Sequence, residues 1–196
     1  MKTVTIVLGD FNGEVEGDVI GVDYGAYICV LKDITMMLAC GDFDSVTPDQ
    51  FQAIESYANE TIALNPEKDL TDFDYAYRLC ADYERILVVG GLGRRRDHEY
   101  LNVMIAMQDS RVEIVDDQNR MQRLDAGTYV INKQDYQYIS FLIITPGFIT
   151  LEGFKYPLTN QPIKPNDTFL TSNEIINSSG TVYLEEAAVL MIQSKP

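Results

Sequence analysis

Short apolar runs alternate with helical patterns through the first half of this chain. The predicted strands are Val4–Leu8, Val19–Val22, Met36–Cys40, Ile62–Leu64, Ile86–Val89 and Val112–Val115. Most of these runs end in glycine or aspartate, which stops a strand and starts a turn. Strands that alternate with helices need crossover connections, so the pattern predicts an α/β domain with a mainly parallel sheet.

The helical patterns lie between these runs. They are Ala26–Leu31, a helix from Thr47 to about Ala58, a helix capped by Thr71 or Asp69 that presents Phe73, Tyr77 and Cys80 on one face, and Asp97–Gln108. The second helix has the clearest start. Thr47 is an N-cap residue, Pro48 follows at the first helical position, and Gln50 stands where a capping-box partner belongs.

The pattern changes after Asp117. The remaining residues give β-like runs separated by turns with Gly, Pro, Asn and Asp, and no long helical stretch interrupts them. These runs are Tyr129–Asn132, Tyr138–Thr145, Phe148–Leu151, Thr168–Leu170 and Thr181–Ile192. The sequence therefore predicts an α/β domain over residues 1–116 and an all-β sandwich domain over residues 117–196.

Composition narrows the function classes. With 196 residues and 46% hydrophobic content, the chain can bury a real core. Its formal net charge of −15 disfavours nucleic acid as a partner, because phosphate backbones need a basic surface. No apolar stretch reaches the about 20 residues of a membrane span, and the start shows no signal peptide, so we expect no membrane partner. Three isolated cysteines without metal-ligand spacing indicate reduced thiols in a cytoplasmic protein.

Two clusters of acidic residues are candidates for a metal site. Asp42 and Asp44 leave a predicted strand two positions apart, where both can point to one side; the alternative is a turn with aspartate caps. Asp69 and Asp72, in the segment Lys68–Asp72, flank a helix start; the alternative for them is ordinary helix capping. Four acids crowded together would repel one another unless a cation were present, and Mg²⁺ suits such all-oxygen ligation.

A Gly/Arg segment at Gly90–His98 follows a buried strand and opens a helix. Glycines allow close backbone approach, and arginine offers a fork for phosphate oxygens. The segment is neither a Walker A loop nor a GxGxxG motif, and solvated arginines in a tight turn are the alternative. His98 is the single histidine of the chain and decides nothing alone.

Asp23, Asp42, Asp44 and the loop Gly90–Gly93 all follow predicted strands. The carboxyl ends of parallel strands share one edge of a sheet, and in open α/β sheets ligands bind there. We therefore expect these residues to meet at one crevice, where a metal and a polyphosphate bind.

In this order and spacing, the motifs resemble those of the thiamine pyrophosphokinase (thiamine diphosphokinase) family. Residues 41–45 match its Gly-Asp-Phe-Asp-Ser signature and residues 69–72 its Asp-x-Thr-Asp element. Residues 90–98, with Asn102, resemble its Gly-x-x-Gly-Gly-Arg-x-Asp-His-x-x-x-Asn motif. Weaker matches at residues 22–26, 153–158 and 171–173 extend the resemblance over nearly the whole chain.

The resemblance implies a homodimeric cytoplasmic enzyme. It would transfer the β,γ-pyrophosphoryl group of ATP to the hydroxyethyl oxygen of thiamine, with AMP as the second product and Mg²⁺ required. The implied metal ligands are Asp42, Asp44 and Asp72, with Asp69 as a further catalytic residue. The implied ATP-binding residues are Arg95, Asp97, His98 and Asn102. Asp23, Ser172 and Asn173 are implied to form a thiamine pocket at a subunit boundary.

The chain departs from the family pattern at a few positions. Tyr24 replaces a glycine of the upstream element, and Arg94 replaces the second glycine of the Gly-Gly-Arg. Two alternatives to the main hypothesis follow: a non-catalytic sensor of nucleotide or thiamine, and a pyrophosphokinase for another small heterocyclic alcohol.

Overall fold

The computed structural model describes residues 1–65, 67 and 69–196. The chain divides into two compact units, which are described separately. Unit 1 comprises Met1–Ile105 and Ile114–Asp117, and unit 2 comprises Ala106–Glu113 and Gln118–Pro196. The predicted boundary between the two functional domains, at residues 116 and 117, stays a prediction.

Unit 1 is built on a parallel sheet. Its strands are β1 (Thr3–Val7), β2 (Asp18–Val22), β3 (Met36–Gly41), β4 (Ala58–Ala63) and β5 (Arg85–Val89), and they lie in the order β4-β3-β2-β1-β5. Each neighbouring pair up to β1–β5 is parallel. β6 (Val112–Val115) follows β5 in the strand order. Side chains of the central strands, such as Ile6 and Val88, are fully buried, as expected for strands covered on both faces.

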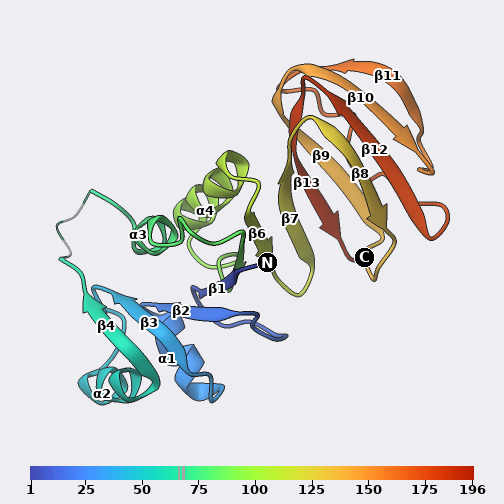
Figure 1. Cartoon of the computed structure of the whole chain (residues 1–196). Coiled ribbons are helices and arrows are strands. Elements are labelled where there is room, and N and C mark those ends of the chain that lie inside the picture. The colour runs from blue at the N-terminus through green and yellow to red at the C-terminus, as the bar shows by residue number, and fades with distance from the viewer. Residues whose placement is uncertain (66, 68) are drawn as a thin grey trace. The chain divides into compact units, whose positions relative to one another are not determined.

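Four helices connect these strands: α1 (Tyr24–Leu31), α2 (Pro48–Tyr57), α3 (Asp72–Arg78) and α4 (Arg96–Gln108). Figure 1 shows α1 and α2 on one side of the parallel strands and α3 and α4 on the other. The described residues contain no helix that is both long and apolar enough to cross a bilayer.

The helix starts follow their capping residues. At α2 the predicted capping box is confirmed: the Gln50 N–H donates to Thr47 Oγ1 at 3.3 Å, and the Thr47 N–H donates to Gln50 Oε1 at 2.8 Å. At α3 the cap is Thr71, whose Oγ1 accepts from the Asp74 N–H at 3.1 Å. This choice places Asp72 at the first position of the helix, where its side chain projects from a fixed backbone.

Unit 2 is antiparallel. Its strands are β7 (Asn119–Leu124), β8 (Gly127–Asn132), β9 (Tyr138–Thr145), β10 (Gly147–Glu152), β11 (Leu158–Ile163), β12 (Ser179–Glu185) and β13 (Ala188–Ser194). They lie in the orders β7-β13-β9 and β11-β10-β12-β8. The two groups enclose one apolar core, in which the rings of Phe141 and Phe154 meet edge to face with centroids 6.4 Å apart. This arrangement confirms the predicted fold class, a mainly parallel α/β part followed by an all-β sandwich.

Some predicted strands of unit 2 were wrong. Residues 168–170 form a turn, although Leu170 is buried in the core. The apolar side chain of Leu170 therefore indicated a buried position but not a strand. The predicted run Thr181–Ile192 is two strands, β12 and β13, which separate at Glu186 with its positive φ of 59°. No apolar run marks β7 or β11, because their residues are mostly polar or charged.

Candidate functional site

A cavity of about 520 Å³ opens in unit 1 where the parallel strands end. Its lining comes from the segments that follow β1, β2, β3 and β5 and from the starts of α1, α3 and α4. The lining residues are Leu8, Val22, Asp23, Tyr24, Asp42, Asp44, Ser45, Thr71, Asp72, Phe73, Gly90, Gly91, Arg94, Arg95, His98 and Asn102. The volume lies within the range of small-molecule sites, and the position is the sheet edge where such folds bind ligands.

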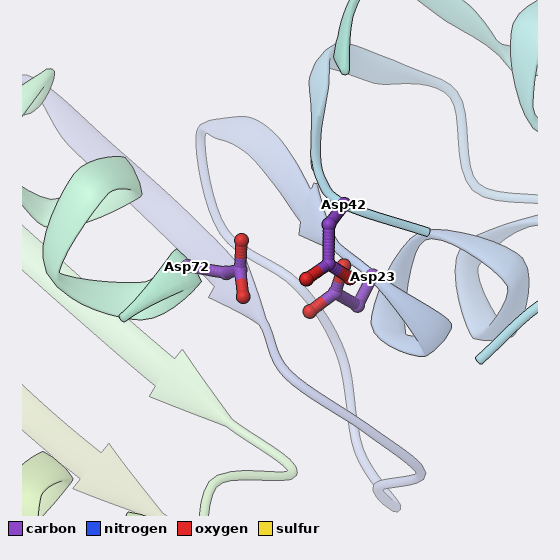
Figure 2. Close-up of side chains that lie close together, drawn as sticks. All are labelled: Asp23, Asp42 and Asp72. Atoms are coloured by element: carbon purple, nitrogen blue, oxygen red, sulfur yellow. The ribbon is translucent and has the colours of Figure 1, made fainter. Parts of the chain in front are cut away.

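Three carboxylates meet in this cavity. Asp23 follows β2, Asp42 follows β3 and Asp72 begins α3, and one oxygen from each lies within 4.8 Å of the other two. Figure 2 shows Asp23 and Asp42 side by side, with Asp72 facing them from the start of its helix. We call these three residues the acid group. Three partly buried carboxylates at this spacing form an all-oxygen set that suits a hard divalent cation.

The backbone around Gly41 makes room for the acid group. Gly41 has a φ of 148°, and a β-carbon at this position would collide with Oδ1 of Asp23. The same Oδ1 accepts a hydrogen bond from the Phe43 N–H at 3.2 Å, and the Asp23 N–H donates to the Cys40 carbonyl at 3.0 Å. The glycine of the Gly-Asp-Phe-Asp-Ser motif therefore allows the Asp23 carboxylate to lie against the turn that carries Asp42.

The acid group is electrostatically strained. Burial, the charge of Asp72 and the charge of Asp42 raise the pKa of Asp23 from 3.8 to about 7, against the opposing hydrogen bond from the Phe43 N–H. Positive charge at this place, such as that of a bound cation, would offset the repulsion between the three carboxylates.

The other two predicted acids lie differently. Asp44 lines the cavity, and its N–H donates to Asp42 Oδ1 at 3.2 Å, but its carboxylate is not one of the three in the acid group. Asp69 precedes the Thr71 cap and is not among the described residues that line the cavity. Lys68, which the sequence analysis named beside it, lies outside the described residues.

Asp23 was predicted for thiamine, and the structure places it in the acid group. A sequence signal for this placement existed. Asp23 and Asp42 each follow a strand directly, and β2 and β3 are parallel neighbours with Val22 opposite Cys40. This register continues to Asp23 and Gly41, so Asp42 is only one residue beyond the position opposite Asp23.

The Gly/Arg segment lines the cavity beside the acid group. Gly90 has a φ of 68°, and a β-carbon there would collide with the Gly9 carbonyl, so the loops after β1 and β5 pack backbone to backbone. The buried side chain of Asn102 donates from Nδ2 to the Gly91 carbonyl at 2.8 Å. The Asn102 amide therefore holds the shape of this loop.

The remaining predicted nucleotide residues lie at the start of α4. Arg95 and His98 line the cavity. Asp97 does not line it and pairs with Arg95, accepting from Nη2 at 2.6 Å and from Nε at 3.2 Å. The hydrogen bond from Arg95 is the main reason that the pKa of Asp97 falls to about 2. Asp97 therefore acts on the cavity through the guanidinium of Arg95.

Ser172 and Asn173 belong to unit 2. The buried Asn173 side-chain amide is hydrogen-bonded to the backbone of Tyr156. Its Oδ1 accepts from the Tyr156 N–H at 3.0 Å, and its Nδ2 donates to the Tyr156 carbonyl at 2.9 Å. Ser172 has a positive φ of 55°, and its N–H donates to Ser140 Oγ at 2.9 Å. These contacts fix the loop and leave the Ser172 side chain exposed.

Two cavity residues were noted in the sequence only as departures from a family pattern. Tyr24 and Arg94 both line the cavity, and the Arg94 guanidinium carbon lies 5.3 Å from the centre of the Tyr24 ring. No motif predicted this contact, since it joins two loops that are distant in the sequence.

Comparison with known proteins agrees with this geometry. Residues 16–115 match a family model described as the thiamin pyrophosphokinase catalytic domain, and residues 128–189 match one described as the thiamin pyrophosphokinase vitamin B1 binding domain. The thiamine pyrophosphokinase of Bacillus subtilis is 34% identical over 99% of each chain.

Solved structures show the same relationship. The crystal structure of thiamine pyrophosphokinase from Bacillus subtilis has a TM-score of 0.88, with 30% identity and all of both chains covered. That of thiamin pyrophosphokinase from Geobacillus thermodenitrificans has a TM-score of 0.84, with 31% identity over 99% of this chain and 98% of that one. Because sequence and structure agree along the full length, this chain belongs to the thiamine pyrophosphokinase family.

Proposed function

We propose that this protein is a thiamine diphosphokinase that converts ATP and thiamine into AMP and thiamine diphosphate. One observation carries the proposal. Carboxylates from three separate segments converge on a cavity that the Gly/Arg segment also lines, in a chain that belongs to this family over its full length. Acids that hold a cation and arginines that bind phosphate are the two requirements of phosphoryl-group transfer.

The reaction needs one bond to form and one to break. The hydroxyethyl oxygen of thiamine attacks the β-phosphorus of ATP, and the bond from that phosphorus to the oxygen bridging to the α-phosphate breaks. AMP leaves with the electron pair of that bond, and the hydroxyl proton passes to a carboxylate of the cavity or to water. The contribution of the chain is to align acceptor and phosphate and to stabilise the charge on the phosphate oxygens.

We propose Mg²⁺ as the metal. The donor set fits it, because the acid group offers three carboxylate oxygens within 4.8 Å of one another and leaves room for water and phosphate oxygens to complete six ligands. Asp42 and Asp72 of the predicted ligands are in this group, together with Asp23, and Asp44 lines the same cavity. When bound, the metal neutralises and orients the polyphosphate. For Asp69, which precedes the Thr71 cap of α3, we propose a catalytic role beside the metal.

We propose that the nucleotide lies along the Gly/Arg segment. Arg95 presents its guanidinium to the cavity and is held by Asp97, His98 lies on the same wall, and Asn102 shapes the loop through Gly91. The Gly/Arg segment resembles known phosphate sites because glycine backbone packs closely there beside cationic side chains.

For thiamine we propose the predicted residues Asp23, Ser172 and Asn173. The match of residues 128–189 to a vitamin B1 binding domain supports a role for Ser172 and Asn173. The net charge of −15 favours the approach of a cationic thiazolium. Asp23 would then serve both purposes, as a ligand of the metal in the acid group and as a carboxylate that attracts the cationic thiazolium.

A homodimer in the cytoplasm completes the proposal. Cys29, Cys40 and Cys80 are buried and form no disulfide among the residues that the structure describes, which fits a reducing compartment. The dimer rests on the family resemblance and is tested by light scattering of the purified protein, which should give twice the mass of 22.1 kDa.

The test of the activity is to incubate the protein with ATP, MgCl₂ and thiamine and to separate the products by chromatography. Thiamine diphosphate and AMP should appear in equal amounts, and neither should appear when EDTA is added. AMP release that depends on another alcohol would identify a different acceptor. Binding of ATP or thiamine without any product would identify a sensor and contradict the proposed enzyme.

A further inference from the structure

The guanidinium of Arg94 lies over the face of the Tyr24 ring, with the carbon Cζ 5.3 Å from the ring centre. Tyr24 begins α1, directly after Asp23 of the acid group, and Arg94 stands in the segment that leads into α4. Both side chains line the cavity. The contact therefore joins the acidic wall of the cavity to its Gly/Arg wall.

The three consecutive arginines differ in their partners. Arg95 is paired with Asp97 at 2.6 Å, and Arg96 is paired with Glu99 at 2.7 Å. Across the part of the chain that the structure describes, no carboxylate lies within 4.0 Å of the Arg94 guanidinium. A cation held over a ring keeps its in-plane N–H groups for other acceptors. Arg94 thus brings an uncompensated positive charge, with several donors, to the cavity.

The backbone also holds Arg94 in place. A β-carbon at Gly9 would lie 3.4 Å from Arg94 Nη1 and 3.7 Å from Arg94 Cδ, so the arginine side chain lies against the backbone just after β1. The Tyr24 ring restrains it from another direction. A long side chain that is already held loses less entropy when it binds a ligand.

We propose that Arg94 binds the phosphate chain of the nucleotide and that Tyr24 is its positioning residue, an inference that rests on the proposed function. Four carboxylates line this cavity, those of Asp23, Asp42, Asp44 and Asp72. A free cation beside so many acids suits a ligand that is itself strongly anionic. The positive charge of Arg94 repels a cationic thiazolium, so we place Arg94 in the part of the cavity that binds ATP and expect little effect on thiamine binding.

The test is the variant Arg94→Gln, with Arg96→Gln as its matched control. Both variants remove one positive charge from the same segment, but Arg96 pairs with Glu99 and is not among the lining residues. In Arg94→Gln we expect the KM for ATP to rise about tenfold or more, because a charge-assisted hydrogen bond is lost. The KM for thiamine should stay within about twofold, as should both values in Arg96→Gln. Equal effects of the two variants on ATP would overturn the proposal.

The role of Tyr24 is tested by two substitutions and one combination. Tyr24→Phe keeps the ring face and should leave the KM for ATP within about twofold. Tyr24→Ala removes the ring and should raise this KM about fivefold, in line with a cation–π contact. In the Arg94→Gln background, Tyr24→Ala should add no more than about twofold. If the two effects multiply, Tyr24 acts independently of Arg94 and its positioning role is wrong.

Calorimetric titration with ATP, in the absence of thiamine, separates this inference from the proposed function. Wild-type protein that binds ATP but makes no thiamine diphosphate contradicts the proposed enzyme. The Kd for ATP of Arg94→Gln, compared with that of Arg96→Gln, still decides the role of Arg94. Wild-type protein that binds no ATP overturns both proposals.

Discussion

Oδ1 of Asp23 occupies the space that a β-carbon on residue 41 would fill, so the glycine at position 41 and the aspartate after β2 depend on each other. The carboxylate lies against the turn and accepts the Phe43 N–H at 3.2 Å. This turn also carries Asp42, so one glycine sets the separation of two members of the acid group. The relationship leads directly to a first prediction.

Gly41→Ala should lower both stability and activity. A residue other than glycine is strained at a φ of 148°, by about 1 to 3 kcal/mol, and its β-carbon would also displace the Asp23 carboxylate. Gly13→Ala is the control, because Gly13 also has a positive φ of 107° but no atom lies within 4 Å of its β-carbon position. Thermal unfolding should show a loss in both variants, and kcat/KM should fall only in Gly41→Ala. Normal activity in Gly41→Ala would show that the Asp23 carboxylate is not needed where it lies.

Asp72→Asn should abolish most of the activity and the stabilisation by Mg²⁺. Loss of one carboxylate from the acid group removes a ligand and a charge, and we expect kcat to fall about a hundredfold or more. Asp74→Asn is matched to it, since Asp74 lies in the same turn of α3 but pairs with Arg78 outside the cavity. The measurement is the shift in melting temperature with MgCl₂, together with turnover.

The same measurement applies to the other predicted ligands. Asp42→Asn should behave as Asp72→Asn does, and Asp44→Asn should lose activity by orders of magnitude if it completes the metal site. A melting temperature that rises with MgCl₂ equally in wild type and Asp72→Asn would exclude the acid group as the metal site.

Without metal, the stability difference between Asp23→Asn and wild type should depend on pH. The folded-state pKa of Asp23 is raised to about 7 from 3.8, so in the folded protein this carboxyl holds its proton more tightly than in the unfolded chain. Its favourable contribution is fully present below pH 4 and is lost as the pH rises through about 7. Asn cannot ionise and keeps the oxygen that accepts from Phe43.

In EDTA, the melting temperature of Asp23→Asn relative to wild type should therefore increase from pH 4 to pH 7.5. Addition of MgCl₂ at pH 7.5 should reverse the order, because the metal stabilises only the protein that has the full acid group. A melting-temperature difference between the two proteins that stays constant with pH would contradict the raised pKa of Asp23.

Thr71→Ala should impair catalysis beyond its effect on stability. The Thr71 hydroxyl caps α3 and thereby fixes the residue that follows it, Asp72. Thr47→Ala removes an equivalent cap from α2, at a position that does not line the cavity. Each variant should lose about 1 kcal/mol of stability by chemical denaturation. Only Thr71→Ala should need more Mg²⁺ for half-maximal activity, and equal Mg²⁺ requirements would mean that the cap does not position Asp72.

Local sequence signals were sufficient for most of the elements. Most apolar runs of unit 1, such as those of β1 and β5, are strands buried on both faces, and the Thr47–Gln50 capping box starts α2 where it was expected. The run Ile62–Leu64 marked only the end of β4, which begins at Ala58 and has no buried residue. The signals failed more often in unit 2, where strands such as β12 alternate buried with exposed residues. β7 and β11 were missed because backbone pairing, and not an apolar run, makes them strands. Residues 168–170 were wrongly predicted as a strand because Leu170 is apolar. Its side chain fills the core from a turn and does not belong to a strand.

For the site, the sequence determined which residue types are present and the edge of the sheet at which they gather. Asp42 and Asp72 were expected together, since each stands at the end of a strand or the start of a helix, and the structure brings them within 4.8 Å. Asp23 was expected at the same edge of the sheet, but only the tertiary structure showed that its carboxylate, and not that of Asp44, belongs to the acid group, and only it placed Arg94 over Tyr24. The physical reason is that residue spacing fixes directions along one segment, whereas side-chain contacts between segments depend on how closely their backbones pack. Here that packing is set by Gly41 and by the contact of Gly9 with Gly90.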